Sequence, residues 1–306
     1  MAFQVALAQI NPRLGDLDKN MALFEEQIAL AIRKKARLIV FPELGLSGYF
    51  LRDMVSEVSI CSNSLILKRL CTLSHKISIV FGAVEETQDV SFYNAAFYIE
   101  KGKLLHIHRK VYLPTYGMFD EQRYFARGKS ARAFDTQFGR IAILNCEDLW
   151  HPSLVQLAVQ DGARMIIAIA SSPGRGVEEG LTLYSTQMWE RMNRFYASLY
   201  GVFYIFVNRA GVEEGVNFWG GSEVIDPEGN VLIKSPYFDA CMDMVLIDDA
   251  MIRQKRIVSP ILREEDIHLT IAELERIRDK QSEPQSGTRK RNAGTLSKRR
   301  GPKDRL

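Results

Sequence analysis

Apolar residues follow two alternating patterns along the first 260 residues of the chain. Runs with the length and composition of buried strands lie at residues 3–10, 38–41, 77–84, 91–99, 104–108, 131–134, 140–144, 165–170 and 202–207. Helical spacing of apolar residues, or a polar residue that can cap a helix, predicts helices at residues 21–35, 62–74, 155–161, 181–200, 248–255 and 264–280. This alternation of strands and helices is typical of an α/β fold.

Two parts of the chain hold consecutive strands with no helix between them. The strands within residues 77–108 are joined by a polar turn at residues 85–89 and by a tight turn at residues 101–103. We predict a meander of three further strands, at residues 221–226, 230–234 and 242–247, with a turn at Asp226-Pro227-Glu228-Gly229. Because strands joined by short turns pair antiparallel, the sheet is expected to be mixed.

The composition is ordinary for a soluble globular protein. Of the 306 residues, 46% are hydrophobic and 25% are charged, which is enough for a sizeable core. The first ten residues read as a strand and not as a signal peptide, since they have no basic segment and no long apolar run. No segment approaches the roughly 20 apolar residues that a membrane helix needs. We therefore expect a cytoplasmic protein that does not bind membranes.

Four cysteines, Cys61, Cys71, Cys146 and Cys241, are scattered without the spacing of a disulfide framework. Together with the missing signal peptide, they indicate free thiols in a reducing cytoplasm. Cys61, Cys71 and His75 do not match any compact zinc-binding spacing. We expect neither a metal nor a cofactor.

Basic charge is concentrated at the C-terminus. Residues 282–306 hold eight Lys or Arg and two acidic residues, a net charge of +6, so the rest of the chain carries −3 of the total of +3. This segment has almost no large apolar side chain, and we expect it to be disordered. A solvated tail is favoured over nucleic-acid binding. The predicted domains are residues 1–260, a helical extension at 261–281, and the tail at 282–306.

A thiol stands at the end of the apolar run at residues 141–144. Asn145-Cys146-Glu147-Asp148 follows that run directly, and His151-Pro152 opens the next predicted helix. A helix N-terminus offers free N–H groups and partial positive charge, which favour a thiolate. Cys146 is accordingly a candidate nucleophile. The alternative is a small core residue, which is what most free cysteines are.

Charged residues follow two other predicted strands in the same way. Glu43 comes after residues 38–41, and Lys110 comes after residues 104–108. Active groups commonly lie beyond the carboxyl ends of strands in open sheets. A cysteine nucleophile needs a base, a cation that favours the thiolate, and donors for the oxyanion. Glu43 can be the base, Lys110 the cation, and the N–H of Glu147 an oxyanion donor.

Histidine is poorly placed to serve as that base. His106 and His108 are the histidines nearest to a strand end, and both sit inside the predicted strand at residues 104–108. A papain-like Cys-His pair is therefore not favoured.

Three segments carry a resemblance to a known family. They are Phe41-Pro-Glu-Leu-Gly-Leu-Ser-Gly-Tyr49, His108-Arg-Lys-Val-Tyr-Leu-Pro114 and Asn145-Cys-Glu-Asp-Leu-Trp150. In order and spacing they resemble the signature segments of the nitrilase, or carbon–nitrogen hydrolase, superfamily. The resemblance implies a catalytic Glu-Lys-Cys set at Glu43, Lys110 and Cys146. It also implies an α-β-β-α sandwich with mixed sheets, whose subunits dimerise into four layers, helix layer to helix layer.

Within that superfamily, residues 116–125 and 146–150 resemble the glutaminase domain of glutamine-dependent NAD synthetases. The resemblance implies that Tyr116 and Ser172 contact the substrate and that Glu121 is an additional active-site carboxylate. Two departures are visible. The family's Ser-Pro-Tyr-His segment reads Ser172-Pro-Gly-Arg-Gly-Val177 here, and no ATP-pyrophosphate loop follows residue 260. We expect a chain that cuts an amide but does not make NAD by itself.

The predicted function is hydrolysis of a small carboxamide, with a glutamine-like ω-amide favoured, through a cysteine thioester. One alternative is an ammonia-supplying subunit that acts with a separate synthetase. Nitrile hydrolysis and a catalytically idle scaffold are weaker alternatives, and the intact Glu, Lys and Cys speak against the scaffold. The expected partners are the amide substrate and further copies of the chain, in a homodimer or a higher homo-oligomer.

Overall fold

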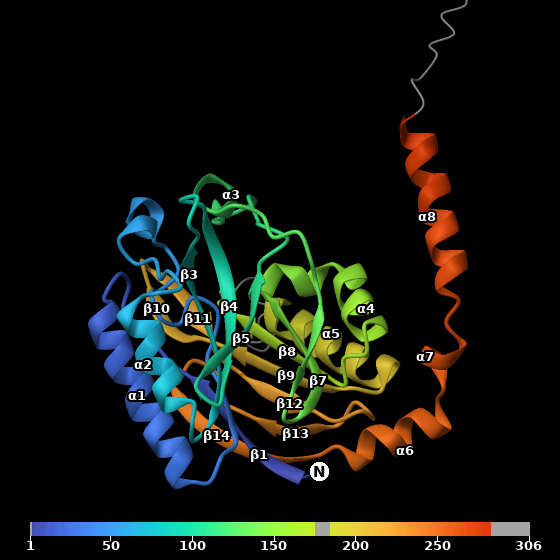
Figure 1. Ribbon diagram of the computed structural model, residues 1–306, viewed down its shortest axis with the longest axis horizontal. Helices are drawn as coiled ribbons and strands as arrows, with labels where there is room; N and C mark the ends of the chain where they lie inside the picture. The colour runs from blue at the N-terminus through green and yellow to red at the C-terminus, as the bar shows by residue number, and fades with distance from the viewer. Residues whose placement is uncertain (1, 175–183, 283–306) are drawn as a thin grey trace, which may run out of the picture. The chain divides into compact units, whose positions relative to one another are not determined.

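Two six-stranded sheets form the centre of residues 2–263 in the computed structural model, which describes residues 2–174 and 184–282 (Figure 1). The first sheet has the order β14 (Cys241–Asp248), β1 (Ala2–Gln9), β2 (Leu38–Val40), β3 (Ser78–Glu86), β4 (Phe92–Glu100) and β5 (Lys103–Arg109). The second has the order β13 (Val231–Lys234), β12 (Glu223–Ile225), β9 (Phe203–Asn208), β8 (Met165–Ala170), β7 (Gly139–Asn145) and β6 (Ala133–Thr136).

Each sheet combines parallel and antiparallel pairs. β1, β2 and β3 run parallel, while β14, β4 and β5 join this sheet antiparallel. In the second sheet β7, β8 and β9 run parallel, and β6, β12 and β13 add to them antiparallel. The prediction of an α/β fold with mixed sheets is therefore confirmed.

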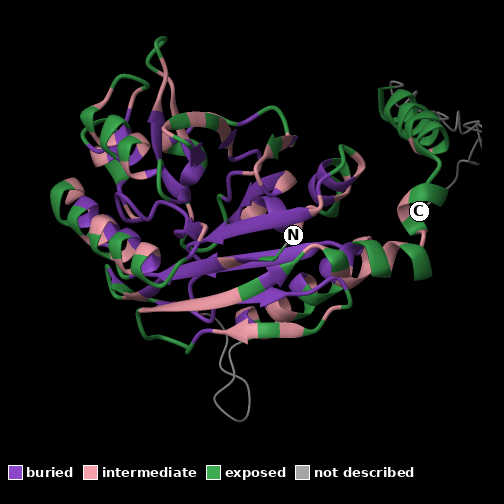
Figure 2. Cartoon of the chain, turned by 60° about the horizontal axis from the view of Figure 1, so that its bottom comes forward, coloured by how far each residue is buried: buried purple, intermediate pink, exposed green. Residues whose placement is uncertain are grey.

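The sheets pack face to face through apolar side chains such as Val5, Leu7, Ile143 and Ile167. Helices α1 (Leu17–Arg33) and α2 (Leu65–Leu73) cover the outer face of the first sheet. Helices α4 (Pro152–Gln160) and α5 (Tyr184–Tyr200) cover the outer face of the second. Figure 2 shows that the strands at the centre of this sandwich are buried along most of their length. The α-β-β-α arrangement is the predicted one.

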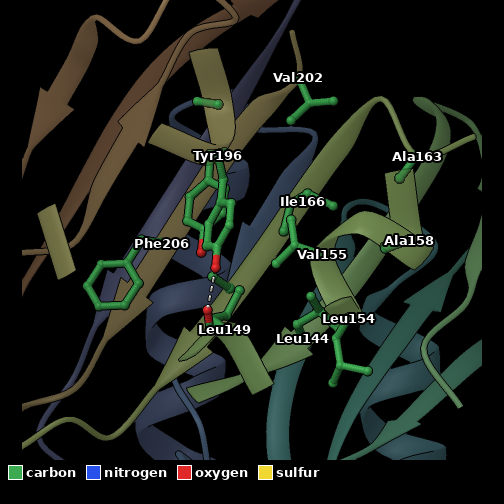
Figure 3. Close-up of a cluster of buried hydrophobic side chains, with 14 of the residues drawn as sticks. Leu144, Leu149, Leu154, Val155, Ala158, Ala163, Ile166, Tyr196, Val202 and Phe206 are labelled. Atoms are coloured by element: carbon green, nitrogen blue, oxygen red, sulfur yellow. Dashed lines mark hydrogen bonds between the residues drawn. The ribbon is translucent and has the colours of Figure 1, made fainter. Parts of the chain in front are cut away.

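The apolar side chains beneath α4 and α5 also support the segment that follows β7. Leu144, Val155 and Ile166 pack there from three elements (Figure 3). Tyr196 on α5 donates a hydrogen bond of 2.9 Å to the carbonyl oxygen of Leu149. This bond connects α5 to the short 3₁₀ helix η2 (Cys146–Trp150).

The predicted meander at residues 221–247 is wrong in its third strand. β12 and β13 form the expected hairpin, but β14 pairs with β1 in the other sheet, from Ala2 opposite Asp248 to Gln9 opposite Cys241. The Gln9 side chain donates to the carbonyl oxygens of residues 236 and 239, which holds the connecting segment. Strand β1 would otherwise be an edge with unpaired backbone groups, so β14 satisfies it.

Other differences are smaller. Helix α1 begins at Leu17 and not near Met21, because the Asp16 side chain accepts the N–H of Lys19 and caps the helix. The hairpin of β10 (Ala210–Glu213) and β11 (Val216–Trp219), the turn η1 (Arg52–Ser56) and the short α3 (Glu121–Tyr124) were not predicted. Helix α6 spans Ala250–Val258.

The chain divides into compact units at residue 263, and the second unit begins at Glu264. The predicted helix at 264–280 corresponds to α8 (Ile267–Ser282), and the short helix α7 (Ile261–Glu264) before it was not predicted. The predicted tail lies, from residue 283 on, outside the described residues, as do residues 175–183. Within the described chain, no helix combines the length and hydropathy needed to cross a membrane.

Candidate active site

Cys146 lies at the sharp turn between β7 and η2. Its φ of 44° is in the left-handed region, which non-glycine residues seldom adopt and which often marks a functional position. The side chain is 8% exposed. The turn therefore presents the thiol at the end of a buried strand while leaving a small opening to solvent.

A pocket of about 230 Å³ lies over this thiol. Its described walls are mostly aromatic, with a few polar side chains: Tyr116, Phe119, Cys146, Glu147, Trp150, Ser172, Pro173, Tyr184, Ser185 and Trp189. A pocket of this size suits a small molecule. Glu147 is the one carboxylate, and no Lys or Arg occurs, among these described lining residues.

Glu43 follows β2 and is fully buried. Its Oε1 accepts hydrogen bonds from Lys110 Nζ at 2.7 Å and from Asn94 Nδ2 at 2.9 Å. Its Oε2 accepts the backbone N–H of Ser171 at 2.7 Å. The carboxylate is thus held in one orientation by donors from three separate strands or strand ends.

Lys110 follows β5 and has no exposed surface. Its Nζ also donates to Glu121 Oε1 at 2.7 Å, so the ammonium lies between two carboxyl groups. Burial by itself would lower the pKa of Lys110, but the charges of Glu121 and Glu43 outweigh it and raise the pKa well above its usual range. The lysine is therefore a permanent cation at neutral pH.

The pKa of Cys146 is raised well above its usual range, first by burial and then by the charge of Glu43. Lys110 opposes this shift, while Glu121 and Glu147 add to it. This is the reverse of the thiolate that the sequence pattern predicted, because three nearby carboxyl groups and desolvation outweigh one cation and a short helix end. Because the pKa of the thiol is raised, attack by the sulfur requires a base that removes its proton.

Glu121 does not line the pocket at Cys146. It lies behind Lys110, accepts a hydrogen bond from the Tyr49 hydroxyl, and lines a separate pocket of about 280 Å³ beside Tyr49 and Phe50. Burial raises the pKa of Glu121 to about 7, although Lys110 works against the shift. The structure thus places this carboxyl group as a partner of the lysine and not as a wall of the pocket.

Glu121→Gln is expected to gain stability over the wild type as pH rises. A carboxyl group whose pKa is raised to about 7 on folding contributes its full stabilisation of the folded state at pH values below its unfolded pKa of about 4.3. That contribution is lost as pH rises through about 7. Glutamine does not titrate, so the difference in unfolding free energy should shift towards the variant between pH 4 and 8, by at most about 4 kcal/mol. Urea unfolding across this range measures it, and a constant difference would contradict the assignment.

Two glycines allow the catalytic segments to approach the sheet. A Cβ on Gly82 of β3 would lie 2.4 Å from the nitrogen of Leu44 and 2.6 Å from Cα of Glu43. A Cβ on Gly128 would lie 2.0 Å from the carbonyl oxygen of Arg109. Any side chain at either position would displace the backbone next to Glu43 or Lys110.

One side chain that contacts both Glu43 and the turn before Cys146 was not predicted as part of the site from the sequence. Asn94, in the middle of β4, donates to Glu43 and accepts from Asn145 Nδ2 at 3.3 Å, and its carbonyl oxygen accepts the N–H of Lys110 at 2.9 Å. A polar residue inside a largely apolar strand, followed by Ala95 and Ala96, was the signal that could have revealed it.

Three predicted substrate-binding residues do lie at the pocket. The Tyr116 hydroxyl donates to Glu147 Oε2 at 2.8 Å. Ser172 accepts a hydrogen bond from Trp189 Nε1 at 2.9 Å, and its backbone N–H donates to Asn208. Burial raises the pKa of Glu147. No group of three or more metal-ligating side chains occurs in the described part of the chain.

Comparison with known proteins identifies the family of this chain. The sequence profile of the carbon–nitrogen hydrolase family matches residues 4–256. The chain belongs to this family. It is therefore an enzyme of the hydrolase class that acts on carbon–nitrogen bonds, as the sequence predicted.

Among relatives of this hydrolase, the glutamine-dependent NAD(+) synthetase of Acinetobacter baylyi is 30% identical over 242 residues. The match covers 78% of the present chain and 42% of the synthetase. The structure of the corresponding synthetase from Acinetobacter baumannii has a TM-score of 0.73 at 28% identity, covering 82% of this chain and 47% of that one. The hydrolase thus spans less than half the length of these synthetases.

A carbon–nitrogen hydrolase from Helicobacter pylori shares the fold over nearly its whole length. Its TM-score is 0.79 at 22% identity, with 90% of this chain and 99% of that chain covered. The predicted resemblance to the nitrilase superfamily, and to the synthetases within it, is confirmed.

Proposed function

We propose that this hydrolase is an amidase whose catalytic domain spans residues 1–260 and that it cleaves a small linear carboxamide, with a glutamine-like ω-amide preferred. The observation that carries the proposal is the buried contact of Lys110 with Glu43, whose charges both act on the Cys146 thiol. This arrangement supplies a base, a cation and a nucleophile beside one small pocket.

In the acylation step, Glu43 removes the proton from the Cys146 thiol as the sulfur attacks the amide carbon. A base is needed because the pKa of that thiol is raised by burial. Lys110 and the N–H of Glu147 stabilise the negative charge that develops on the amide oxygen. The carbon–nitrogen bond then breaks, Glu43 returns the proton to the departing nitrogen, and ammonia leaves a thioester on the sulfur.

Deacylation reverses these roles with water as the nucleophile. Glu43 takes a proton from water as its oxygen attacks the thioester carbon, and the carbon–sulfur bond breaks. The proton returns to the thiolate, and a carboxylic acid is released. The hydrogen bonds from Ser171 and Asn94 keep the Glu43 carboxylate in place through both steps.

The head group of the substrate is proposed to carry an amine. Glu147 is directed at the pocket by Tyr116 and is the charged side chain among the described lining residues. A carboxylate held between aromatic walls suits an ammonium group, and glutamine has one.

Glu147→Gln is expected to raise KM for glutamine on the order of 10-fold, the value of one charge-assisted hydrogen bond in a half-buried site. For glutaramic acid, which has the same ω-amide without the amine, KM should stay within about 2-fold because that bond is absent. Ammonia release measured for both substrates gives the comparison. An equal rise in KM for the two amides would remove Glu147 from head-group recognition.

Supply of ammonia to a synthetase is a second candidate function. The observation that favours it is the match to synthetases whose names specify glutamine as the nitrogen source. Under this proposal the chain acts with a separate NAD synthetase. Added synthetase should then form NAD from glutamine only when this hydrolase is present.

We further propose that the chain works as a homodimer in the cytoplasm. The free cysteines Cys61, Cys71, Cys146 and Cys241 fit a reducing compartment. Leu157 on α4 and Phe195 on α5 are 54% and 57% exposed, and such apolar side chains on an outer helix layer fit an interface between copies. Analytical ultracentrifugation should give twice the chain mass. A monomer at micromolar concentration would rule the dimer out.

The amidase proposal is tested by ammonia release across a panel of amides. The panel contains glutamine, asparagine, glutaramic acid, short aliphatic amides and the corresponding nitriles. Turnover of ω-amides with none of nitriles is the expected result. Ammonia release from nitriles alone would replace the amidase by a nitrilase, and no release from any compound would overturn both.

A further inference from the structure

Asp148 lies two residues after the nucleophile, and its side chain is fully buried. Its Oδ1 accepts the backbone N–H groups of Val111 and Tyr112, both at 2.9 Å. Its Oδ2 lies 2.7 Å from Nε2 of His108 and accepts the backbone N–H of Asn145 at 3.3 Å. One carboxylate thus fastens the chain at residues 108–112 to the turn that begins at Asn145.

These two segments carry different members of the catalytic cluster. Val111 directly follows Lys110, beyond the end of β5 in the first sheet. Asn145 directly precedes Cys146, at the end of β7 in the second sheet. Ladder hydrogen bonds fix each strand end within its own sheet. The lysine and the thiol belong to different sheets, so ladder hydrogen bonds do not set the distance between them. Asp148 connects the two segments directly.

The link is strong because the Asp148 carboxylate that accepts these hydrogen bonds is charged and is shielded from water. Hydrogen bonds to a charged group are stronger than those between neutral groups. The bonds of Asp148 with Val111, Asn145 and His108 are buried, and the bond with Tyr112 is partly buried. His108 is 2% exposed and projects from β5. With its Nε2 hydrogen donated to Oδ2, the imidazole prevents the carboxylate from rotating, so Oδ1 remains directed at the segment after Lys110.

We propose that Asp148 and His108 are positioning residues that set the separation between the Lys110 ammonium and the Cys146 thiol. The inference rests on the proposed amidase function. Neither side chain is among the described residues that line the pocket at Cys146, so they act through the catalytic groups. A change in either one should slow the chemical step and leave substrate affinity nearly unchanged.

Asp148→Asn keeps the side-chain shape but replaces one acceptor oxygen by an NH₂ group that faces other donors. We expect kcat for glutamine to fall about 100-fold, the effect of displacing a reacting group by about 1 Å, with KM changed by less than about 3-fold. Asp226→Asn is the matched control. Asp226 is 3% exposed and accepts two backbone N–H groups on Oδ1 and a side-chain bond on Oδ2, in the β12–β13 turn. Its kcat should stay at the wild-type level.

His108 provides a test that does not alter the carboxylate. His108→Gln retains a side-chain N–H that can donate to Asp148, whereas His108→Leu does not. We expect the glutamine variant to retain at least about 10-fold more activity than the leucine variant, the worth of about one such bond. Equal activity in the two variants would show that the hydrogen bond has no positioning role.

Alkylation of Cys146 by iodoacetamide separates this proposal from the amidase proposal, because it needs no amide substrate. Asp148→Asn should slow alkylation about 10-fold or more, since a displaced Lys110 no longer stabilises the thiolate, and Asp226→Asn should not. Failure of the wild type to hydrolyse any amide would overturn the proposed amidase function. The alkylation rates of the variants would still test the positioning role. If both variants match the wild type, or if both lose activity to the same extent, the positioning role is overturned.

Discussion

The Cys146→Ala variant is expected to release no measurable ammonia from any amide that the wild type hydrolyses. The thioester needs the sulfur, and no other side chain among the described lining residues of the pocket is an activated nucleophile. Loss of a nucleophile of this kind typically lowers kcat by at least about 1,000-fold. The fold should be retained, because the change removes one atom from a side chain that lines a pocket. A coupled ammonia assay measures the activity, and circular dichroism checks the fold.

Cys241→Ala is the control for this variant. Cys241 is also a free cysteine, half-buried on β14, and its loss should leave turnover unchanged. Cys146→Ser should be nearly inactive, since a hydroxyl is far harder to deprotonate than a thiol. Residual turnover above a few percent in pure Cys146→Ala would exclude the thioester route.

Glu43→Gln is expected to slow both acylation and deacylation by at least about 100-fold, the lower end of what general base catalysis provides. The amide can still accept the hydrogen bonds of Lys110 and Asn94, but it cannot take a proton. The effect should be large here because burial, the main cause of the raised pKa of the Cys146 thiol, remains in the variant. Rapid mixing with a chromogenic ester resolves the burst of acylation from the steady state of deacylation.

A buried carboxylate away from the site serves as the control. Glu100 is 5% exposed and accepts a hydrogen bond from the Tyr98 hydroxyl at 2.8 Å. Glu100→Gln should keep both phases at the wild-type rate. An unchanged burst and normal turnover in Glu43→Gln would make Glu43 a structural residue, and the base would then have to be Glu121.

The positions of the candidate catalytic residues could be predicted because each follows a short apolar run. A buried strand needs continuous hydrophobic side chains, so a glutamate, a lysine or a cysteine directly after such a run is conspicuous. The same rule predicted most strands of both sheets, whereas the layers of the sandwich were expected only from the family resemblance. The pairing of β14 with β1 could not be predicted in this way, because backbone pairing between residues 240 positions apart leaves no local pattern.

The roles of the polar residues near the catalytic groups could also not be predicted from the sequence. Asn94 and Asp148 look like an interrupted strand and an ordinary turn residue, and only their distant partners reveal what they hold. Glu121 was expected in the active site through the family resemblance, but its contact with Lys110 and its separation from the pocket depend on where the segment at 114–121 folds back.

The sequence by itself determined the α/β class, the mixed sheets, the family and the three strand ends that bear Glu43, Lys110 and Cys146. These follow from hydrophobic periodicity and from motifs only a few residues long. Only the tertiary structure showed in which direction the pKa of the Cys146 thiol shifts, which is upward and opposite to the expectation. The helix end that favours a thiolate is a local feature, whereas burial and the charges of Glu43 and Glu121 come from segments far away in the sequence. In a site shielded from water, the charges of these distant residues outweigh the effect of the helix end, because little solvent screens them.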